Sequence, residues 1–599
     1  MRYVLRVVAA ADECVETAEE EALLARLRLT AGVPPGDHGG PAAHGLVAHG
    51  FGRHLGLTVR WRLAALPDGS LFEELTSPQL SFCWGYDAPT DELWEADHVG
   101  MGTHLQLDDR EVVLLSGFVR TGVWLHPDVQ KHLCIRLLDP EQSGALPGDV
   151  DHVAGDLRAL HPEAEATGKQ PPVGLTLRLR RGGRLAAHLR VCPTTGRVLL
   201  LWMRVAGDTE VWVFGHSDNH GCLPALVVHA TRTGARDVYR TDGVRPLAPL
   251  PPAWFSPPPG CMTSLRGCSY DPAAPPALRT ERSRSGHLLV RIAVDGADVG
   301  WCILDTGASG FVISKAAADA AGMDAFGEVY VAGVGSKVAS RFRRCASLTV
   351  GPVTFEAPLL LEMSLAGIVW GASGPCIGIV GYDLFRAAVV DIPPHPGTQI
   401  SVAHPVEWQA PGGLAAQWRW VPVAMVANVP HAWARWHGVP GDGEAELLML
   451  DTGAGGADAI FHARSVARLG LGTVGAYSGT SSIRGVSSSA DAAPAGQRAS
   501  PAAPQEAAPP TQRRQLDWLE LVHGPGAPPS APGHEATSVR FDRVEALMLG
   551  THGAFDLSEH MSGAVCMPLL ARTRIVCDLF RRRIAFVAEG ADDARVGAA

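Results

Sequence analysis

Two similar stretches decide the fold of this 599-residue chain: ILDTGASGFVIS at residues 303–314 and LMLDTGAGGADAIF at residues 448–461. Each places an aspartate, Asp305 or Asp451, directly after an apolar run typical of a buried strand, with no basic residue beside it. A single Asp-Thr-Gly triplet is a weak signal, because Asp and Gly often form the turn at a strand end. Two triplets in the same setting indicate a repeated unit.

The same elements surround both triplets in the same order, which indicates an internal repeat. In the first copy, strands joined by an Asp-Gly turn at 295–296 precede the triplet, and a helix pattern, SKAAADAAGM, follows it. In the second copy the helix pattern is FHARSVARLGL. A Gly-rich element and apolar strands ending in Asp391 or Asp578 close each copy. The second copy also contains an Ala/Pro/Ser-rich tract, 487–512, that we predict to be a disordered insertion.

Composition and strand patterns divide the chain into four parts. Residues 1–243 alternate apolar and polar side chains and predict a β-rich domain with few helices. Prolines crowd the segment 244–285, which we interpret as a linker. The two copies of the repeat occupy 286–400 and 415–590. We therefore expect a mainly β protein, with an N-terminal domain followed by two all-β lobes.

Bulk composition excludes several classes of function. Apolar residues make up 46% of the chain, but no apolar run approaches the roughly 18 residues that span a bilayer. The net charge of -11 argues against a nucleic-acid partner, because phosphate binding requires a basic surface. The opening residues are a poor signal peptide, so the sequence leaves the cellular compartment open.

Cysteine and histidine spacing gives no sign of a metal site. The twelve cysteines show no metal-ligand spacing, and we predict reduced core thiols, with a Cys261–Cys268 disulfide as the alternative. The segment HSDNH contains His216, Asp218 and His220 at every second position, a spacing that would place metal ligands on one face of a strand. Its polar surroundings favour a surface loop instead. We expect neither a metal nor another cofactor.

Two carboxylates that meet on a two-fold axis in a partly dry site cannot both ionise. Asp305 and Asp451 would then share one proton, so that one acts as a base toward water and the other as an acid toward a carbonyl oxygen. This hypothesis explains why neither aspartate needs a neighbouring cation.

The residues beside the aspartates suit such a site. Gly307 and Gly453 allow the backbone to approach the carboxylates closely. Thr306 and Thr452 are expected to hydrogen-bond across the axis and hold the two loops together. Ser309 is predicted to donate to the outer oxygen of Asp305. Because Gly455 takes the matching place in the second copy, the two aspartates should be inequivalent.

The first copy resembles the retropepsin-like aspartic proteases over about residues 287–393, where ILDTGAS, VAGVG and GIVGYDLF occur in that order. The resemblance implies that Asp305 is catalytic and that Ile379, Val380 and Gly381 form a strand beneath its loop. It implies flaps at Gly333, Val334 and Gly335 in the first lobe and at Gly485 and Val486 in the second. The second lobe departs from the family pattern: ungapped counting back from Asp578 puts Pro568 where the first lobe has Gly381.

The resemblance implies an aspartic endopeptidase whose Asp305 and Asp451 activate water against an extended peptide, with both lobes paired within one chain. A homodimer through the first lobe is the structural alternative. A non-catalytic peptide- or lipid-binding protein with a degenerate second lobe is the functional alternative.

The N-terminal region loosely resembles the LolA-like lipoprotein-sorting domain. The segments that carry this likeness are GYDAPTDELWEADHVG at 85–100 and TTGRVLLLWMRVAGDTEVWVFGHSDNHGCLPALVVHA at 194–230. The resemblance implies a half-barrel with an apolar hollow for a lipid or an extended peptide. The alternative is a β-scaffold that presents the two lobes.

Overall fold

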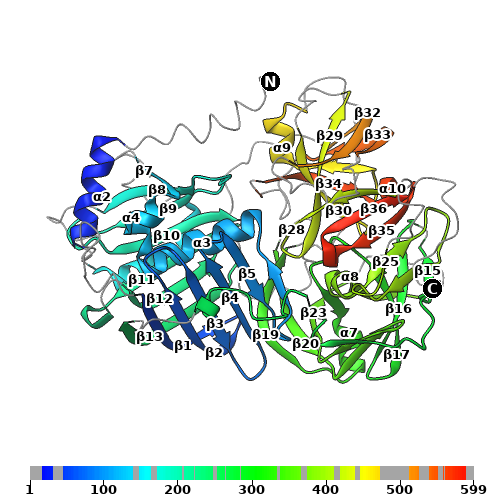
Figure 1. The fold of residues 1–599 in the computed structure, drawn as a ribbon, viewed down its shortest axis with the longest axis horizontal. Helices are drawn as coiled ribbons and strands as arrows, with labels where there is room; N and C mark the ends of the chain where they lie inside the picture. Colours follow the sequence, from blue (N-terminus) through cyan, green and yellow to red (C-terminus); the bar gives the residue numbers. More distant parts are fainter. Residues whose placement is uncertain are drawn as a thin grey trace, which may run out of the picture. The chain divides into compact units, whose positions relative to one another are not determined.

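The computed structural model confirms a mainly β protein and divides into two compact units, residues 1–266 and 267–599 (Figure 1). The boundary lies inside the Pro-rich segment 244–285. The structure describes residues 17–30, 45–138, 148–162, 172–205, 208–220, 223–246, 252–263, 265–283, 285–332, 337–365, 374–409, 418–438, 445–471, 511–524, 538–550, 558 and 560–587.

The first unit is built on one antiparallel sheet in the order β6-β5-β4-β3-β2-β1-β13-β12-β11-β10-β9-β8-β7. Two meanders make up this sheet, and they join where the first strand pairs with the last. In β2, leucine, valine and tryptophan alternate with threonine and arginine, and the apolar side chains are buried; β10 and β11 are buried along most of their length. The strands are β1 (Leu46–His54), β2 (Leu57–Ala65), β3 (Leu71–Thr76), β4 (Ser81–Asp87), β5 (Glu92–Ala96), β6 (Gly102–His104), β7 (Leu133–Leu137), β8 (Val173–Leu179), β9 (Ala187–Val191), β10 (Val198–Val205), β11 (Asp208–His216), β12 (Pro224–Thr231) and β13 (Arg236–Pro246).

Helix α3 (Leu107–Thr121) connects the two meanders and packs on the sheet. Its Gly117 lies against Leu71 and Trp84 of β3 and β4, where a larger side chain would collide. The helix ends at Gly122, which adopts a left-handed conformation (φ 76°). The other helices described in this unit are α2 (Ala18–Thr30) and the short η2 (Val123–Leu125), α4 (Pro127–Gln130), η3 (Gly148–Val153), α6 (Ala154–Leu160), η5 (Asp218–His220) and η6 (Pro252–Trp254).

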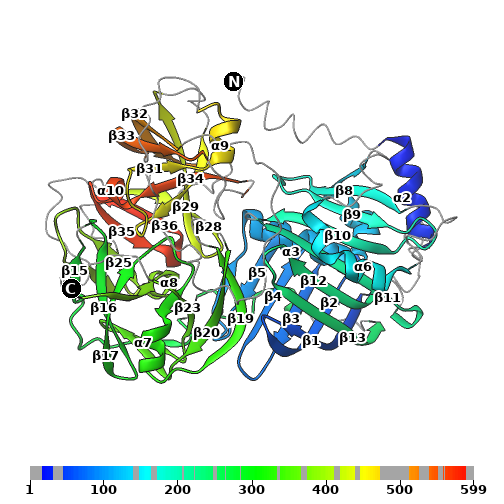
Figure 2. The same ribbon diagram turned by 180° about the vertical axis from the view of Figure 1, so that it is seen from behind.

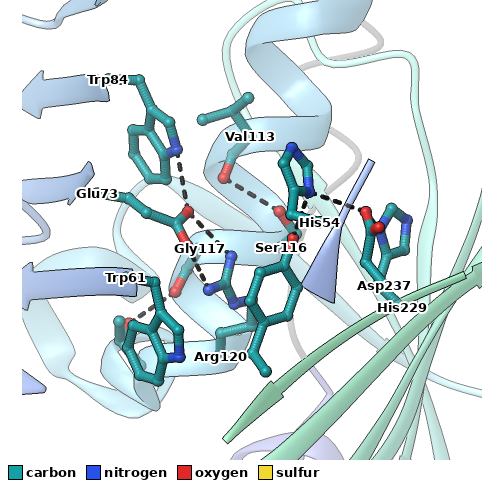
Figure 3. Close-up of polar contacts among 12 residues, drawn as sticks. His54, Trp61, Glu73, Trp84, Val113, Ser116, Gly117, Arg120, His229 and Asp237 are labelled. Carbon is teal, nitrogen blue, oxygen red and sulfur yellow. Dashed lines mark hydrogen bonds and ion pairs between the residues drawn. The ribbon is translucent and has the colours of Figure 1, made fainter. Parts of the chain in front are cut away.

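A buried ion pair fixes α3 to the sheet (Figure 3). The Arg120 guanidinium donates to both carboxylate oxygens of Glu73, at 3.0 and 2.6 Å. The indole Nε1–H of Trp84 donates to the same carboxylate at 3.0 Å. Because Glu73 is 4% exposed, these donors replace the water that its charge would otherwise bind.

A second polar group joins β1 to β13 at the seam between the two meanders (Figure 3). Nδ1 of His54 lies 2.9 Å from the Asp237 carboxylate and 2.7 Å from the Tyr239 hydroxyl. The backbone N–H of Leu55 donates to the other Asp237 oxygen at 2.8 Å. These contacts fix the register of β1 against β13, the strand pair that joins the two meanders.

The second unit contains two lobes. The sheet of the first lobe has the order β14-β22-β21-β16-β17-β24-β18-β23-β20-β19, and β15 pairs with β16. The predicted hairpin turn at Asp295 and Gly296 is confirmed, since both residues have positive φ and Val294 pairs with Ala297. The elements are β14 (Cys268–Tyr270), β15 (Thr280–Arg282), β16 (Leu288–Val294), β17 (Ala297–Leu304), β18 (Phe311–Ser314), α7 (Lys315–Ala320), β19 (Ala325–Ala332), β20 (Lys337–Arg344), β21 (Ser347–Val350), β22 (Val353–Glu356), β23 (Leu359–Met363), β24 (Cys376–Val380) and α8 (Tyr382–Ala387).

The second lobe repeats the central pairings of the first. Its sheet has the order β28-β29-β30-β34-β31-β33-β32. β30 pairs parallel with β34, and β31 pairs antiparallel with β34 and parallel with β33; β17, β24, β18 and β23 pair in the same way. The elements are β28 (Ala424–Val426), β29 (Val429–His437), β30 (Glu446–Asp451), β31 (Ala459–Phe461), α9 (Ala463–Arg468), β32 (Gln512–Val522), β33 (Val539–Met548), β34 (Met561–Cys566) and α10 (Met567–Leu570).

A third sheet of this unit, in the order β26-β25-β35-β36-β27, combines strands from both halves of the repeat. Figures 1 and 2 show β35 and β36, in red, beside β25. A bidentate ion pair from Arg574 to Asp391, at 2.9 and 2.7 Å, joins two of its strands. The elements are β25 (Val389–Ile392), β26 (Ser401–Ala403), β27 (Trp418–Pro422), β35 (Arg574–Asp578), η10 (Leu579–Arg581) and β36 (Arg583–Val587). One continuous apolar core runs through both lobes.

The structure tests several predictions made from the sequence. Within the described part of the chain, Cys261 and Cys268 are both free thiols, so the alternative disulfide between them is absent. The prediction of reduced core thiols is confirmed for the buried residues Cys302, Cys376 and Cys566, whereas the half-buried Cys134, on β7, is disulfide-bonded. Gln512, placed at the end of the predicted insertion, begins β32, and residues 487–510 lie outside the described residues. No helix in the described ranges is long and apolar enough to cross a bilayer.

Candidate active site

The first Asp-Thr-Gly loop follows β17 and lies over β24. Leu304 pairs with Val380 in parallel register, and the N–H of Asp305 donates to the Val380 carbonyl at 3.0 Å. Gly381 comes next, and only a residue without a side chain fits there: a Cβ would overlap Gly310 and lie 2.6 Å from the Ala308 oxygen. The apolar strand beneath the loop therefore fixes where Asp305 emerges.

The second loop is built in the same way on β30 and β34. Leu450 pairs with Val565 and Asp451 with Cys566, again in parallel. Met567 N–H donates to the Ala454 carbonyl at 3.0 Å, as Tyr382 N–H does to Ala308 at 2.9 Å in the first lobe.

These matched contacts make Cys566, not Pro568, the counterpart of Gly381, so the ungapped count is wrong. The segment from Cys566 to Asp578 is longer than the matching segment from Gly381 to Asp391. A count back from Asp578 without a gap therefore stops short of Cys566. The second loop is also longer than the first. Ile313 and Phe461 pair with the matching residues Gly378 and Gly563, but Phe461 lies farther along the chain from Asp451 than Ile313 does from Asp305. The extra length of this loop leaves room for the buried Cys566 side chain.

The two loops meet through their threonines. Thr306 N–H donates to Thr452 Oγ1 at 2.9 Å, and Thr452 N–H donates to Thr306 Oγ1 at 3.0 Å. Each hydroxyl then donates to the opposite strand, Thr306 to the Leu450 carbonyl at 2.6 Å and Thr452 to the Leu304 carbonyl at 3.0 Å. Both threonines are 2% exposed, so water cannot replace these bonds and the loops are held as one rigid pair.

The loop glycines bring the two carboxylates together. A Cβ on Gly307 would lie 2.5 Å from Cγ of Asp451, and a Cβ on Gly453 would overlap the carboxyl group of Asp305. Each glycine thus faces the aspartate of the opposite lobe. The side chains of Asp305 and Asp451 are also hydrogen-bonded to each other.

The environments of the two aspartates differ. Burial, the charge of Asp451 and the hydrogen bond with it raise the pKa of Asp305 well above its usual range. Burial also raises the pKa of Asp451, but the bond to Asp305 and two backbone donors oppose that rise. Gly453 N–H and Ala454 N–H donate to Asp451 Oδ1 at 2.8 and 2.9 Å, whereas Gly307 N–H donates to Asp305 at 2.7 Å. The charge of Asp451 thus disfavours ionisation of Asp305, while the two backbone donors favour the carboxylate form of Asp451.

Ser309 lies on the surface at the end of the first loop. It is exposed, and among the described residues no hydrogen bond joins it to Asp305. Gly455, its counterpart, lies against His287 of the first lobe, whose Cε1 a Cβ would approach to 3.0 Å. Sequence reasoning missed His287 because only the fold brings it to the second loop.

A hairpin of β19 and β20 stands beside the first loop. Val331, on β19, packs with Ala308 against an apolar cluster that contains Ile303 and Ile379. The hairpin thus contacts the same wall that supports Asp305. The predicted flap residues Gly333, Val334, Gly335, Gly485 and Val486 lie outside the described residues.

Comparisons with known proteins concern mainly the first lobe. Residues 290–384 match a family model described as aspartyl protease, a range that includes Asp305 and ends in α8. A comparison with curated proteins finds no match.

Similar solved structures include an aspartic proteinase from Irpex lacteus and the Basic 7S globulin from soybean. The first is 12% identical, with 54% of this chain and 99% of that chain covered and a TM-score of 0.33. The second is 9% identical, with 52% and 94% covered and a TM-score of 0.31. This chain thus contains a region similar to aspartyl proteases, in a mainly β unit that carries a second Asp-Thr-Gly loop.

Proposed function

We propose that the second unit is an aspartic endopeptidase with both lobes in one chain, and that Asp305 and Asp451 are its catalytic residues. The observation that carries the proposal is the reciprocal approach of each loop glycine to the opposite aspartate. It supports a single site with two carboxyl groups in contact, the arrangement needed to share a proton. The threonine bonds between the loops support the rigidity that such a site requires.

The proposed reaction begins with a water molecule between the two carboxyl groups. Asp451, as the carboxylate, takes a proton from the water while the water oxygen attacks the peptide carbonyl carbon. Asp305 gives its proton to the carbonyl oxygen, and a tetrahedral diol forms. The peptide C–N bond then breaks as Asp451 returns its proton to the leaving nitrogen, and a diol hydroxyl returns a proton to Asp305. The pair ends in its starting state.

The proposed substrate is an extended peptide or protein segment. The β19–β20 hairpin, in contact with the wall behind Asp305, supports binding of a peptide as an added strand between the hairpin and the loops. No cofactor takes part in this mechanism, since both proton transfers use the two carboxyl groups.

Cleavage of casein or a peptide library between pH 3 and 7 tests the proposal. Wild-type protein should cleave, and both Asp305→Asn and Asp451→Asn should lose activity because either change removes one of the two proton-transfer groups. Asp324→Asn, which alters an exposed aspartate of the first lobe, is the matched control and should cleave like wild type.

Other outcomes would favour the alternatives. Loss of cleavage in Asp305→Asn alone would favour a homodimer through the first lobe. A wild-type protein that binds peptide or lipid without cleaving at any pH would favour a non-catalytic binding protein. The resemblance of the first unit to LolA-like domains stays a prediction. Binding of a lipid by the full-length protein would support it, and no binding would argue against it.

A further inference from the structure

The sheet of the first lobe has an apolar face on the side of its catalytic aspartate. Leu304 belongs to the core that runs through both lobes, on the other face. Ile303, Ile379 and Val312 belong to a separate cluster. Ile303 pairs with Ile379 and Ile379 with Val312, so the three lie side by side on adjacent strands. Because side chains alternate between the faces of a strand, Asp305, two residues after Ile303, emerges on their face. We call these three residues the first wall.

The second lobe has a matching wall. Leu450 belongs to the shared core, whereas Met449 and Ala564 belong to a separate cluster. Ile460 packs against that cluster. Met449 pairs with Ala564 and Ala564 with Ile460, so these three also lie side by side. Asp451, two residues after Met449 on β30, shares their face. We call Met449, Ala564 and Ile460 the second wall.

Both walls reach solvent beside the catalytic loops. Ala308 and Ala454 directly follow the two loop glycines, are half-buried, and pack against the clusters of the first and the second wall. Val331, from the β19–β20 hairpin, is also half-buried and packs against the cluster of the first wall. A peptide bound beside the two aspartates would therefore lay the side chains next to its cleaved bond against the two walls.

The two walls differ at their centres. Ala564 holds the place of Ile379, since each pairs with the residue two before an aspartate. Met449 likewise holds the place of Ile303. All residues of the first wall are β-branched, which restricts χ1 and makes that wall a stiff surface. Alanine is much smaller than isoleucine, and methionine is unbranched and adapts its shape. The centre of the second wall is therefore smaller and more pliable than that of the first.

Room for a ligand beside Ala564 depends on Met449. Ala564 is 4% exposed and Met449 is 8% exposed, so neighbouring side chains cover the alanine when no peptide is bound. A large apolar side chain of a peptide reaches the alanine when the flexible methionine turns aside. The first wall makes no such room, because its branched side chains cannot turn aside and forcing a large group against them is unfavourable.

We propose that the second wall holds the larger of the two apolar side chains that flank the cleaved bond, and that Ile379 and Ala564 set this difference. The first wall would then take a small or medium-sized apolar side chain, such as valine, and the second wall an aromatic one, such as phenylalanine. The inference rests on the proposed peptidase function. It adds to that function a class of substrate with unequal side chains at the cleaved bond.

Cleavage of a peptide library that varies both residues at the cleaved bond tests the inference. Wild-type protein should accept phenylalanine on one side and disfavour it on the other. Ala564→Ile should lower kcat/KM for phenylalanine on the accepting side by about tenfold and leave the other side unchanged. Ala564→Val should shift the preference in the same direction by less. Ala346→Ile makes the same replacement at an exposed position and is the matched control, which should cleave like wild type.

Exchange of the two central residues gives the most specific result. In the double variant Ile379→Ala/Ala564→Ile the small residue moves from the second wall to the first, so the preference for phenylalanine should move to the other side of the cleaved bond. This result does not depend on the direction in which the peptide runs through the site. Equal preferences on both sides in wild type, or a wild-type preference in the double variant, would overturn the inference. If thermal unfolding shows that the double variant is poorly folded, the shift in Ala564→Val decides instead.

Binding of peptides that cannot be cleaved separates this inference from the proposed function. The probes are two peptides with a reduced CH2–NH bond in place of the cleaved amide, one with phenylalanine before this bond and one with phenylalanine after it. If wild type cleaves nothing but binds one probe about tenfold more tightly, and the double variant reverses the order, the proposed function fails and the role of the walls stands. If wild type cleaves and the double variant keeps its preference, the role of the walls fails alone. If wild type neither cleaves nor binds, both fail.

Discussion

At the scale of single residues, four hydrogen bonds of 2.6–3.0 Å join two threonines to each other and to the strands of the opposite lobe. Each lobe supplies one hydroxyl that accepts from the opposite backbone N–H and donates to the opposite backbone carbonyl. Only a hydroxyl does both in this space, which is why serine, but not valine, is a suitable replacement.

Replacement of Thr452 by valine tests this interlock. Thr452→Val keeps the shape but leaves the Thr306 N–H and the Leu304 carbonyl without their partner, at a cost of about 1–3 kcal/mol for each buried group. Thr452→Ser should retain most of the stability. The denaturant midpoint of the second unit measures both changes, and a valine variant as stable as wild type would refute the interlock.

The sequence could predict the aspartates, glycines and threonines because each belongs to a short motif whose local geometry is fixed. It could not predict His287, which lies well over a hundred residues from Gly455 and is brought there by the pairing of the lobes. The counterpart of Gly381 was misplaced at Pro568 because the segment between β34 and Asp578 is longer than the one between β24 and Asp391, which shifts a count made back from Asp578.

At the scale of elements, the second lobe carries two buried histidines that the proposed chemistry does not use. His431 lies in β29 and His462 precedes α9; burial lowers the pKa of each to about 4. His431 Nδ1 lies 2.9 Å from the Val429 carbonyl, while His431 Nε2 and His462 Nδ1 have no partner among the described residues. Both rings are therefore held neutral in a place that disfavours charge.

This burial predicts acid sensitivity of the second lobe. The unfolded chain binds these protons near pH 6.5 and the folded chain only near pH 4, so the unfolded state binds more protons between those values. Stability should fall as pH falls from about 6.5 to 4, by roughly 3 kcal/mol for each histidine. Denaturant unfolding of His431→Leu at pH 7 and pH 4.5 should show a smaller loss than wild type.

The matched control lies on the same strand. His437 has an exposed side chain, paired with Asp517, so His437→Gln should leave the pH dependence nearly unchanged. A wild-type protein whose stability is equal at pH 7 and pH 4.5 would contradict the assignment of buried neutral rings.

In the first unit, the Glu73–Arg120 pair should be the main anchor of α3. Glu73→Ala leaves Arg120 buried without its partner carboxylate, which should cost about 3–5 kcal/mol. Glu74→Ala, one residue along β3, removes a partly exposed partner of Arg62 and should cost at most about 1 kcal/mol. Thermal unfolding of the first unit compares the two variants, and equal costs would show that α3 is held in another way.

At the scale of the whole molecule, the mainly β class and the repeated unit could be predicted because strand alternation and motif order are local properties. The strand order of the first sheet could not: β1 and β13 are far apart in sequence, and their pairing depends on contacts such as His54 with Asp237. The sheet that combines strands of both lobes was not predicted for the same reason.

We propose that two aspartates of one chain form one catalytic site. Peptide cleavage by an equimolar mixture of Asp305→Asn and Asp451→Asn chains distinguishes this site from one shared between chains. Because every site of a one-chain enzyme in the mixture carries one asparagine, we expect no cleavage beyond that of either variant alone. Recovery of a substantial part of the wild-type rate on mixing would contradict it, since an intact site would then have formed from two chains.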